Sequence, residues 1–324
     1  MLRLGLLSTA AISRQILQGA QESDEVEVVA VASRDAARAE AYARANGLGR
    51  SYGSYDALLA DADVDAVYNP LPNSLHVPWS VRALEAGKHV LCEKPLSRRP
   101  DELAAAFDFA ERHGLVLAEA FMYRHHPQTA RVAELVAGGA VGRLRHLRAA
   151  FSFRLGDPGD IRMDAELDGG ALMDVGCYCV SGSRLLAGEP EHAFGEQVVG
   201  ESGVDLAFHG TLRFPDDVVA QLDASFVAPL RQSLEAIGED GVIVVEAPWR
   251  QDWGGRVLLR RDGEDERIEI PEANAYRLEL EDLARAARGE AAPLLGRDDG
   301  LAQARTIDAL FRSADEGGLV TVSR

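Results

Sequence analysis

The first 121 residues alternate between short apolar segments and helical segments, and this alternation constrains the fold more than any other feature of the chain. Apolar segments that we expect to be strands lie at 2–7, 25–33, 65–72, 88–95 and 115–121, with a short strand near 50–52. Helical segments separate them, at 12–20, 35–47, 76–87 and 100–113. Strands that alternate with helices in this way predict βαβ units, and right-handed crossovers then give a doubly wound parallel sheet.

The pattern changes after residue 121. A helix at 128–137 leads into a half-exposed strand at 143–153, and another helix covers about 171–186. Paired strand segments joined by turn residues follow, and these predict hairpins at 206–226, 233–247 and 256–270. Helices near 275–288 and 299–315 end the chain. We therefore predict an α/β Rossmann domain at 1–121 and an α+β domain with an open, mainly antiparallel sheet at 122–298, with the helix at about 299–315 packing back on the first domain.

The composition excludes several classes of function. The net charge of −18 over 324 residues repels phosphate, and so opposes binding to nucleic acid or to an anionic membrane surface. No apolar run approaches the roughly 18 residues of a membrane span. Three cysteines are too few for a disulfide framework and are typical of a reducing cytoplasm, where we expect the protein. Because Cys177-x-Cys179 has no second pair of ligands nearby, we expect buried thiols and no metal site.

The segment "GLLSTAAIS" (5–13) stands where a dinucleotide-binding domain would place a glycine-rich loop. Such a loop needs small residues for a tight turn, for close approach of the backbone to a pyrophosphate and for helix–strand packing. Small side chains occupy the glycine positions here, and backbone N–H groups at the start of the helix still face a phosphate. We expect the pyrophosphate at Ser8, Thr9, Ala10, Ala11 and Ile12; the alternative is a purely structural strand–helix turn.

The second strand ends in Ser33-Arg34-Asp35, where an acidic residue would take the ribose hydroxyls of NAD. Arg34 and Arg38 lie four residues apart on the first helical turn. A serine and two guanidinium groups suit a 2′-phosphate, so this pattern favours NADP, while Asp35 keeps NAD possible. The alternative for Arg38 is a solvated helix charge.

Two later strands deliver polar residues to their carboxyl ends, where open α/β sheets bind ligands. After the third strand, "NPLPNSLH" (69–76) offers Pro70, Leu71, Asn73 and His76 as cofactor contacts. Asn73 can instead serve as a helix N-cap, and His76 can be an ordinary first-turn histidine. After the next strand, "CEKP" (92–95) places Glu93 and Lys94 at the sheet edge, where an unused lysine is costly. We expect both residues to contact the cofactor; the alternative is a salt bridge between the two.

The segment "DGGALMDVGCYCV" (168–180) predicts a flexible approach through Gly169 and Gly170, followed by a helix with Asp174 and Tyr178 on one face. A carboxylate and a phenol on one stripe can hold adjacent sugar hydroxyls. A lysine near the phenol would bring it closer to working pH as a general acid or base. The alternative is an amphipathic helix with Asp174 in a cap network, and His125 or His126 would then be the next acid–base candidates.

Five segments together resemble the Gfo/Idh/MocA family of oxidoreductases: "RLGLLSTAAIS", "YGSYDALLADADVDAVYNPLPNSLH", "AGKHVLCEKPLS", "EAFMYRHHPQ" and "GGALMDVGCYCV". They cover most of residues 1–190 in order, whereas the C-terminal half is similar in pattern more than in motif. The most similar branch contains dimeric dihydrodiol dehydrogenase, NADP-dependent D-xylose dehydrogenase and glucose–fructose oxidoreductase. In that branch the opening loop is often Ser-Thr-Ala-like.

The resemblance implies a catalytic, substrate-orienting role for Lys94, the lysine of the family's Glu-Lys-Pro motif. It implies that Asp174 and Tyr178 occupy the family's Asp-x-x-x-His pair. The tyrosine agrees with the branch named above, and it makes inositol dehydrogenase activity less expected. We also place Arg124, within "EAFMYRHHPQ", among the substrate-binding residues.

The sequence thus predicts an NADP-preferring oxidoreductase that acts on a sugar, polyol or dihydrodiol. The branch resemblance implies a homodimer or homotetramer formed through the C-terminal sheet, whose far face we expect to carry alternating apolar residues. Two alternatives remain open. A nucleotide-sugar ketoreductase would need a basic patch for the diphosphate, which the sequence does not visibly offer. A non-catalytic dinucleotide-binding regulator is opposed by the presence of both Lys94 and Tyr178.

Overall fold

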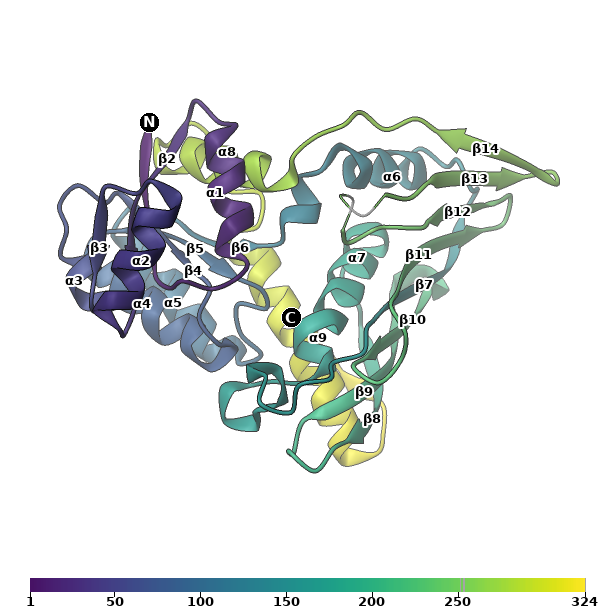
Figure 1. Cartoon of the computed structure of the whole chain (residues 1–324). Helices are drawn as coiled ribbons and strands as arrows, with labels where there is room; N and C mark the ends of the chain where they lie inside the picture. The colour runs from purple at the N-terminus through teal and green to yellow at the C-terminus, as the bar shows by residue number, and fades with distance from the viewer. Residues whose placement is uncertain (251, 253, 324) are drawn as a thin grey trace. The chain divides into compact units, whose positions relative to one another are not determined.

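A computed structural model describes residues 1–250, 252 and 254–323 (Figure 1). The chain forms two compact units, each built from two stretches of sequence. The first unit comprises Met1–His125 and Asn274–Leu301, and the second comprises His126–Ala273 and Ala302–Arg324. The chain thus leaves the first unit after His125, close to the boundary at 121 that we expected, and returns to it at Asn274.

A six-stranded parallel sheet forms the centre of the first unit, in the order β3-β2-β1-β4-β5-β6. Its strands are β1 (Leu2–Leu6), β2 (Val26–Ala32), β3 (Arg50–Tyr52), β4 (Ala66–Asn69), β5 (His89–Glu93) and β6 (Leu117–Ala120). Its helices include α1 (Ser13–Gln21), α2 (Ala36–Asn46), α3 (Tyr55–Leu59), α4 (His76–Glu85) and α5 (Pro100–Arg112). Every residue of β4 and β6 is buried, as in a parallel sheet covered on both faces. The strand order reverses between β1 and β4, which is where such sheets bind ligands.

A later helix completes the first unit. It is α8 (Ala275–Ala287), which packs on α1 at Gly19, where a Cβ atom would lie 2.8 Å from the backbone nitrogen of Arg277. The structure therefore differs from our expectation that the helix at 299–315 packs here. Only the start of α9 (Arg297–Glu316) belongs to the first unit, and from Ala302 the helix belongs to the second. The close glycine contact explains the difference, because it lets the two backbones of α1 and α8 meet directly.

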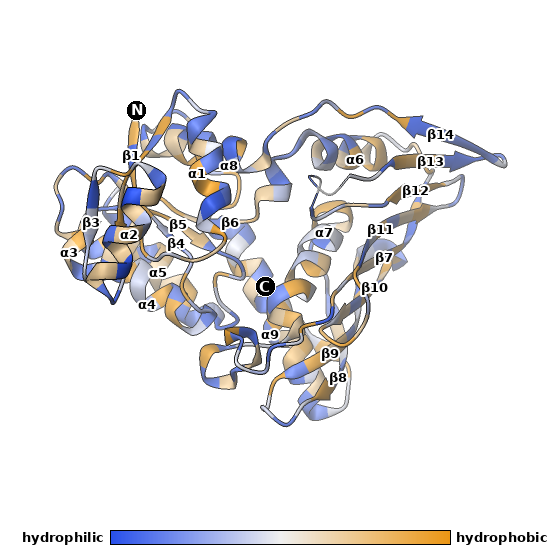
Figure 2. Cartoon of the chain, in the orientation of Figure 1, coloured by the Kyte–Doolittle hydropathy of each residue, from blue (hydrophilic) through white to orange (hydrophobic). Residues whose placement is uncertain are grey.

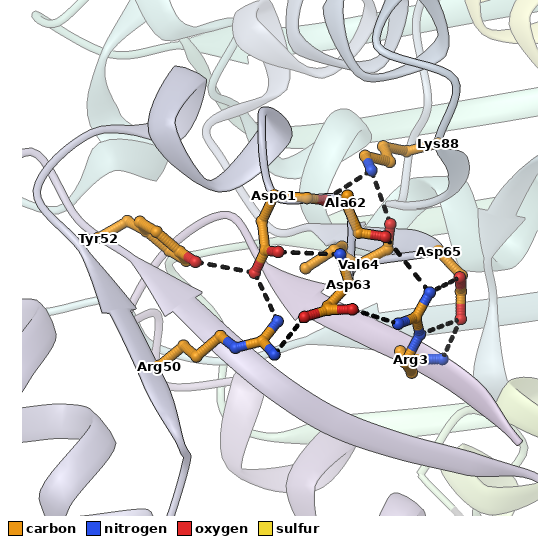
Figure 3. A network of polar contacts seen from close by, with 9 residues as sticks. All are labelled: Arg3, Arg50, Tyr52, Asp61, Ala62, Asp63, Val64, Asp65 and Lys88. Atoms are coloured by element: carbon orange, nitrogen blue, oxygen red, sulfur yellow. Dashed lines mark hydrogen bonds and ion pairs between the residues drawn. The ribbon is translucent and has the colours of Figure 1, made fainter.

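A dense polar network lies at the amino ends of the strands of the first sheet (Figure 3). Arg3 binds both oxygens of Asp65, at 2.7 and 2.9 Å, and pairs with Asp63 at 2.8 Å. The ammonium of Lys88, in a buried residue, donates to the carbonyl oxygens of Asp61 and Val64, each at 2.7 Å. Because ligands bind at the opposite, carboxyl ends of such strands, this network ties β1, β4 and β5 together rather than forming a ligand site.

The second unit contains a nine-stranded sheet in the order β14-β13-β12-β11-β7-β10-β9-β8-β15. Its strands are β7 (Leu144–Ser152), β8 (His192–Val199), β9 (Asp205–Arg213), β10 (Val219–Ser225), β11 (Arg231–Gly238), β12 (Val242–Val245), β13 (Val257–Arg261), β14 (Glu264–Ile268) and β15 (Val320–Thr321). All pairings are antiparallel except that of β10 with β7. The three expected hairpins are β9–β10, β11–β12 and β13–β14, and they confirm a mainly antiparallel sheet.

Helices cover one face of this sheet (Figure 1). They are α6 (Pro127–Ala137), α7 (Cys177–Ala187) and the second part of α9, whose Leu310 lies against Gly195 and Gly210. The alternating apolar residues, such as Leu147 and Phe208, are buried, while Arg148, His209, Gln221 and Asp223 are exposed. Our expectation of an apolar far face was therefore wrong, because the helices cover the apolar positions. The edge strand β14 is hydrophilic (Figure 2), which discourages strand pairing with another chain. In the described part of the chain, no helix has the length and apolar character needed to cross a bilayer.

Candidate functional site

The loop between β1 and α1 presents a helix start with no side-chain cap. The N-cap residue is Ile12, and no acidic residue stands in the first turn of the helix. The residues before it are small, with Ala11 exposed, and the Ser8 hydroxyl accepts a hydrogen bond from the Ala10 N–H at 3.2 Å. Gly5 is needed for packing, because a Cβ atom there would lie 2.8 Å from Leu58. The N–H groups of Ser13, Arg14 and Gln15 donate to the carbonyls of the preceding turn, at 3.1, 3.3 and 2.9 Å. An anion at this helix start would therefore be met by N–H groups of the small-residue turn before the helix.

After β2, the side chain of the acidic residue and those of the two arginines have different contacts. The Asp35 carboxylate is the N-cap of α2, where Oδ1 accepts hydrogen bonds from the N–H groups of Ala37 and Arg38, at 2.9 and 3.3 Å. Arg34 and Arg38 are both exposed, and neither guanidinium has a hydrogen bond or ion pair with any residue that the structure describes. One oxygen of the carboxylate thus caps the helix, and the two exposed cations are available to a phosphate.

The loop after β4 is held by its own buried side chains. Asn69, which is fully buried, donates from Nδ2 to the His76 carbonyl at 3.0 Å and to the Ser80 hydroxyl at 3.2 Å. His76 is also buried, and its two ring nitrogens lie 2.8 Å from the carbonyl oxygens of Pro95 and Leu71. This ring therefore ties two loops together through both of its nitrogens, and its expected contact with the cofactor stays a prediction. Asn73 begins a 3-10 turn, and the N-cap of α4 is Leu75.

Three contacts fix the backbone around Lys94 at the carboxyl end of β5. Glu93 accepts hydrogen bonds from the buried Tyr68 hydroxyl at 2.5 Å and from the Lys94 N–H at 3.2 Å. His76 binds the Pro95 carbonyl, and the buried Glu119 accepts from the Leu96 N–H at 2.8 Å. Glu93 is therefore part of the scaffold of this segment, and its expected contact with the cofactor stays a prediction. The lysine at this sheet edge has a backbone that is held on both sides.

A buried carboxyl group that the sequence analysis missed lies near Glu93. Glu279, on α8, is 2% exposed, and its Oε1 has no hydrogen-bond partner among the described residues. Burial raises the pKa of Glu279 well above its ordinary value, and the charge of Glu93 raises it further. The available signal was its position on the apolar stripe formed by Tyr276, Leu280 and Leu283.

We expect Glu279→Gln to stabilise the chain at neutral pH. A carboxyl group whose pKa is higher in the folded state contributes fully to stability at pH values below its unfolded-state pKa, near 4.3. That contribution is lost as the pH rises toward the folded-state pKa. Glutamine does not ionise, so the gain in unfolding free energy should grow from about zero near pH 4 to roughly 1–3 kcal/mol at pH 8. Denaturant unfolding across this range measures it. Glu281→Gln is the matched control, because Glu281 pairs with Arg277 at 3.5 Å. Unfolding free energies of the parent and of Glu279→Gln that change in parallel with pH would contradict the expectation.

In the second unit, the residues before α7 form a π-helical turn at Leu172–Gly176, and Asp174 lies within it. This differs from the single α-helix that we expected over 171–186, and π-turns are frequent at functional sites. The preceding glycines are closely packed rather than flexible. A Cβ atom at Gly169 would lie 2.3 Å from the Arg162 carbonyl oxygen, and one at Gly170 (φ +113°) would lie 2.0 Å from Asp205. Asp205 also accepts the Leu172 N–H at 2.7 Å.

An arginine that the sequence analysis did not select holds Asp174. The Arg162 Nε donates to Asp174 Oδ2 at 2.9 Å, and its Nη1 lies 3.2 Å from both carboxylate oxygens of Asp160. The sequence held no signal for these ion pairs, because Asp160 lies two residues before Arg162 and Asp174 twelve residues after it, and neither spacing by itself predicts a contact.

Aromatic side chains surround Tyr178 on the first turn of α7. Tyr178 is 7% exposed, and its ring meets Phe151 edge-on at 5.5 Å between centroids and Trp249 at 6.1 Å. Trp249 is itself fixed, since its Nε1 donates to the Ala150 carbonyl at 3.0 Å. These contacts hold the ring, so a change at its hydroxyl leaves the packing intact.

Comparison with known proteins places both halves of the chain. Residues 3–121 match the oxidoreductase family with an NAD-binding Rossmann fold, and residues 129–244 match the GFO/IDH/MocA C-terminal domain. The chain belongs to the Gfo/Idh/MocA family. It is 41% identical over 320 residues to D-xylose 1-dehydrogenase (NADP(+)) 2 of Haloferax volcanii, with 98% of each chain covered.

Two solved structures show the same fold as this Gfo/Idh/MocA chain. One is aldose-aldose oxidoreductase from Caulobacter crescentus in complex with glycerol, with a TM-score of 0.91 and 27% identity over 99% of each chain. The other is KijD10, a 3-ketoreductase from Actinomadura kijaniata in complex with NADP and TDP-benzene, also with a TM-score of 0.91. It is 32% identical and covers 96% of this chain and 97% of its own. The expected family and fold class are thus confirmed.

The remaining polar candidates of this Gfo/Idh/MocA chain have defined surroundings. Arg124 pairs with Asp299 at 3.4 Å. Burial lowers the pKa of His125 to about 3, so this imidazole is neutral at working pH. His126 caps α6 by accepting the Gln128 N–H at 3.1 Å, and burial lowers its pKa as well.

No cluster of His, Cys, Asp or Glu suited to a metal ion is present among the described residues. All three cysteines are buried with free thiols, and burial raises the pKa of Cys92 and Cys179 well above the ordinary value. Cys177 and Cys179 are therefore buried in the way that small apolar side chains are.

Proposed function

We propose that the chain transfers hydride between NADP and a hydroxyl or carbonyl group of a sugar, polyol or dihydrodiol. One observation carries the proposal: Lys94 stands at the carboxyl end of β5 with its backbone fixed by Glu93, His76 and Glu119. Three buried or half-buried side chains thus hold the backbone of the segment that carries this lysine. Its relatives include an NADP-dependent D-xylose dehydrogenase and an aldose-aldose oxidoreductase, which supports a sugar as substrate.

The residues of the first unit fit NADP. The uncapped start of α1 suits the pyrophosphate, next to Ser8, Thr9, Ala10, Ala11 and Ile12. The exposed Arg34 and Arg38, with Ser33, suit the 2′-phosphate, while the Asp35 carboxylate is held by α2. Pro70, Leu71 and Asn73 remain the proposed contacts after β4. NAD remains possible as a weaker ligand.

We expect Arg34→Ala to weaken NADP binding selectively, by roughly 1–3 kcal/mol for a lost charge-assisted contact, and to leave NAD binding unchanged. Titration of both cofactors by calorimetry measures the difference. Arg44→Ala is the matched control, because Arg44 lies at the other end of α2, paired with Glu40 at 2.6 Å. Equal dissociation constants for NADP and NAD in the parent chain would reject the assignment.

The chain's own residues then divide the work. In oxidation, Tyr178 takes the proton of the substrate hydroxyl, while the bound nicotinamide supplies the hydride acceptor. The Lys94 ammonium holds that hydroxyl and favours the phenolate form of the tyrosine. The Asp174 carboxylate holds a neighbouring hydroxyl, and Arg124 is a further proposed contact. Reduction follows the same path backwards.

A panel of aldoses, polyols, dihydrodiols and nucleotide-linked sugars tests the function, with NADP and NAD, by absorbance of the reduced cofactor. Turnover of uncharged sugars or dihydrodiols supports the proposal. Turnover confined to nucleotide-linked sugars would instead favour a ketoreductase, the alternative suggested by the likeness to KijD10. Cofactor binding with no turnover on the whole panel would indicate a dinucleotide-binding regulator.

We also propose a homodimer or homotetramer that meets through the uncovered face of the second sheet. This face carries His209, Asp223 and Arg231, with His209 2.8 Å and Arg231 3.8 Å from the Asp223 carboxylate. Light scattering at micromolar concentration should give a multiple of the 34.9 kDa chain mass. A charge reversal, Asp223→Arg, should then lower the mass, whereas a monomeric parent would refute the proposal.

The three buried thiols fit a reducing cytoplasm, where we place the chain.

A further inference from the structure

Gln303 is a buried residue of α9 whose amide bridges two groups of α7. The residue is 1% exposed, its Oε1 accepts a hydrogen bond from Arg184 Nη1 at 2.9 Å, and its Nε2 donates to the Cys177 carbonyl at 2.8 Å. A guanidinium can only donate and a carbonyl oxygen can only accept, so one orientation of the amide satisfies both groups. Gln303 therefore holds the two groups in a defined direction.

Arg184 is itself held in place on α7. Its side chain is 2% exposed, and its Nε and Nη2 donate to the two carboxylate oxygens of Glu189, each at 2.8 Å. This bidentate pair fixes the plane of the guanidinium, from which Nη1 meets the amide of Gln303. Arg184 lies two helical turns after Cys177, so both are on the same side of α7.

The carbonyl that Gln303 binds lies at the junction of two kinds of helix. The π-helical turn ends at Gly176, and α7 begins at Cys177. The Cys177 carbonyl belongs to the peptide group whose nitrogen is that of Tyr178, so the hydrogen bond acts on the peptide plane directly before the tyrosine. A slip of one residue at this junction would turn the preceding side chains by about 100° around the helix axis relative to Tyr178.

We propose that Gln303 is a positioning residue, whose amide, oriented by Arg184, fixes the peptide group before Tyr178 and thereby the direction of the phenol hydroxyl. The inference rests on the proposed function, because it takes Tyr178 as the acid–base group. Phe151 and Trp249 hold the ring, whereas Gln303 holds the backbone that carries it. Proton transfer needs the hydroxyl within hydrogen-bond reach of the reacting oxygen, so a small rotation of the helix start slows the reaction.

The first experiment compares Gln303→Glu with Gln303→Met. Glutamate keeps an acceptor for Arg184 but loses the donor to the Cys177 carbonyl, because a carboxylate beside a guanidinium stays ionised. Methionine has a similar length and loses both contacts. Both variants should lower kcat for the best sugar roughly 10- to 100-fold and leave the Kd of NADP unchanged. Parent-like kcat in Gln303→Glu would overturn the proposal, because the amide would then serve only to satisfy the arginine.

Ser313→Ala is the matched control for lost stability. Ser313 is also buried on α9, where its hydroxyl accepts the Gly195 N–H at 3.0 Å and donates to the Gly318 carbonyl. Its loss should lower the denaturation temperature and leave turnover per folded molecule unchanged. A fall in kcat as large as that of Gln303→Glu would show that turnover follows stability, and would overturn the positioning role.

A combination with Tyr178→Phe tests whether Gln303 acts through the phenol. In Tyr178→Phe, which lacks the hydroxyl, adding Gln303→Glu should cost little further turnover, because its effect passes through that hydroxyl. Losses that multiply in full would overturn the positioning role. Gln303→Met carries this test and the next one if the buried carboxylate of Gln303→Glu prevents folding.

Fluorine NMR of the chain labelled with 3-fluorotyrosine reports on the ring without any need for turnover. The chain has seven tyrosines, and the Tyr178 signal is the one that is absent from Tyr178→Phe. This signal should shift or broaden in Gln303→Glu and stay in place in Ser313→Ala. An unchanged Tyr178 signal in Gln303→Glu would overturn the proposal.

The NMR and turnover results together distinguish this inference from the proposed function. A parent that turns over no sugar, with a Tyr178 signal that moves in Gln303→Glu, rejects the function and supports the positioning of the ring. Turnover in the parent, with a kcat and a Tyr178 signal that Gln303→Glu leaves unchanged, rejects the inference alone. Absence of turnover together with an unchanged signal rejects both.

Discussion

Lys94→Ala should bind NADP nearly as the parent does, yet oxidise its best sugar at least roughly 10²–10⁴-fold more slowly. Under the proposed mechanism, the substitution removes a substrate contact together with the charge that favours the phenolate of Tyr178. Folding should survive, because the contacts that fix this segment use the backbone of residues 94–96. Steady-state turnover, with NADP affinity measured in parallel, gives the result.

Lys88→Ala is the informative contrast to Lys94→Ala. The Lys88 ammonium donates hydrogen bonds to the carbonyl oxygens of Asp61 and Val64, in the network at the amino ends of the strands (Figure 3). Its loss should lower the free energy of unfolding and leave turnover per folded molecule near that of the parent. If the two lysine variants show the same profile, or if Lys94→Ala retains turnover, the assignment of Lys94 is wrong.

The first domain could be predicted closely because its signals are local. Each strand of the parallel sheet is a continuous apolar segment between helices, so the element order follows from periodicity, and the doubly wound class follows from right-handed crossovers. The packing of α8 could not be predicted in this way. It depends on Gly19 meeting Arg277, a contact between residues more than 250 positions apart.

The candidate site shows the same difference between residues with local sequence signals and residues whose contacts are distant in the sequence. Residues at strand ends, such as Lys94, could be selected from the sequence because parallel strands present their carboxyl ends to ligands, and their roles stay predictions. His76 was assigned to the cofactor, and the structure gives both of its nitrogens to backbone carbonyls. Arg162 and Glu279 were missed, since their meaning comes from partners elsewhere in the fold. A sequence pattern shows where a side chain lies along an element, but not which groups will satisfy it.

Tyr178→Phe should reduce turnover by roughly 10²–10⁴ while folding and NADP binding are retained. Phenylalanine keeps the ring contacts with Phe151 and Trp249 and removes only the ionisable hydroxyl. His125, the next acid–base candidate from the sequence, is a poor substitute for the lost base, because burial lowers its pKa to about 3. Near-parent turnover in Tyr178→Phe, on the best substrate found, would reject the mechanism.

The double variant of Lys94 and Tyr178 tests whether the two residues, which belong to different units, act on one substrate molecule. Groups that work as a unit lose less together than the product of their single losses, whereas independent groups multiply. We therefore expect Lys94→Ala/Tyr178→Phe to be about as slow as the slower single variant. The parent's rate of sugar oxidation should also rise with pH through a limb below about 10, the value for an unperturbed tyrosine, because an ammonium favours the phenolate. That limb should disappear in Tyr178→Phe and move toward 10 in Lys94→Ala, since only the first change removes the titrating group and only the second removes the charge that we propose to act on it. Multiplicative losses with an unmoved limb would mean that the lysine and the phenol serve separate steps.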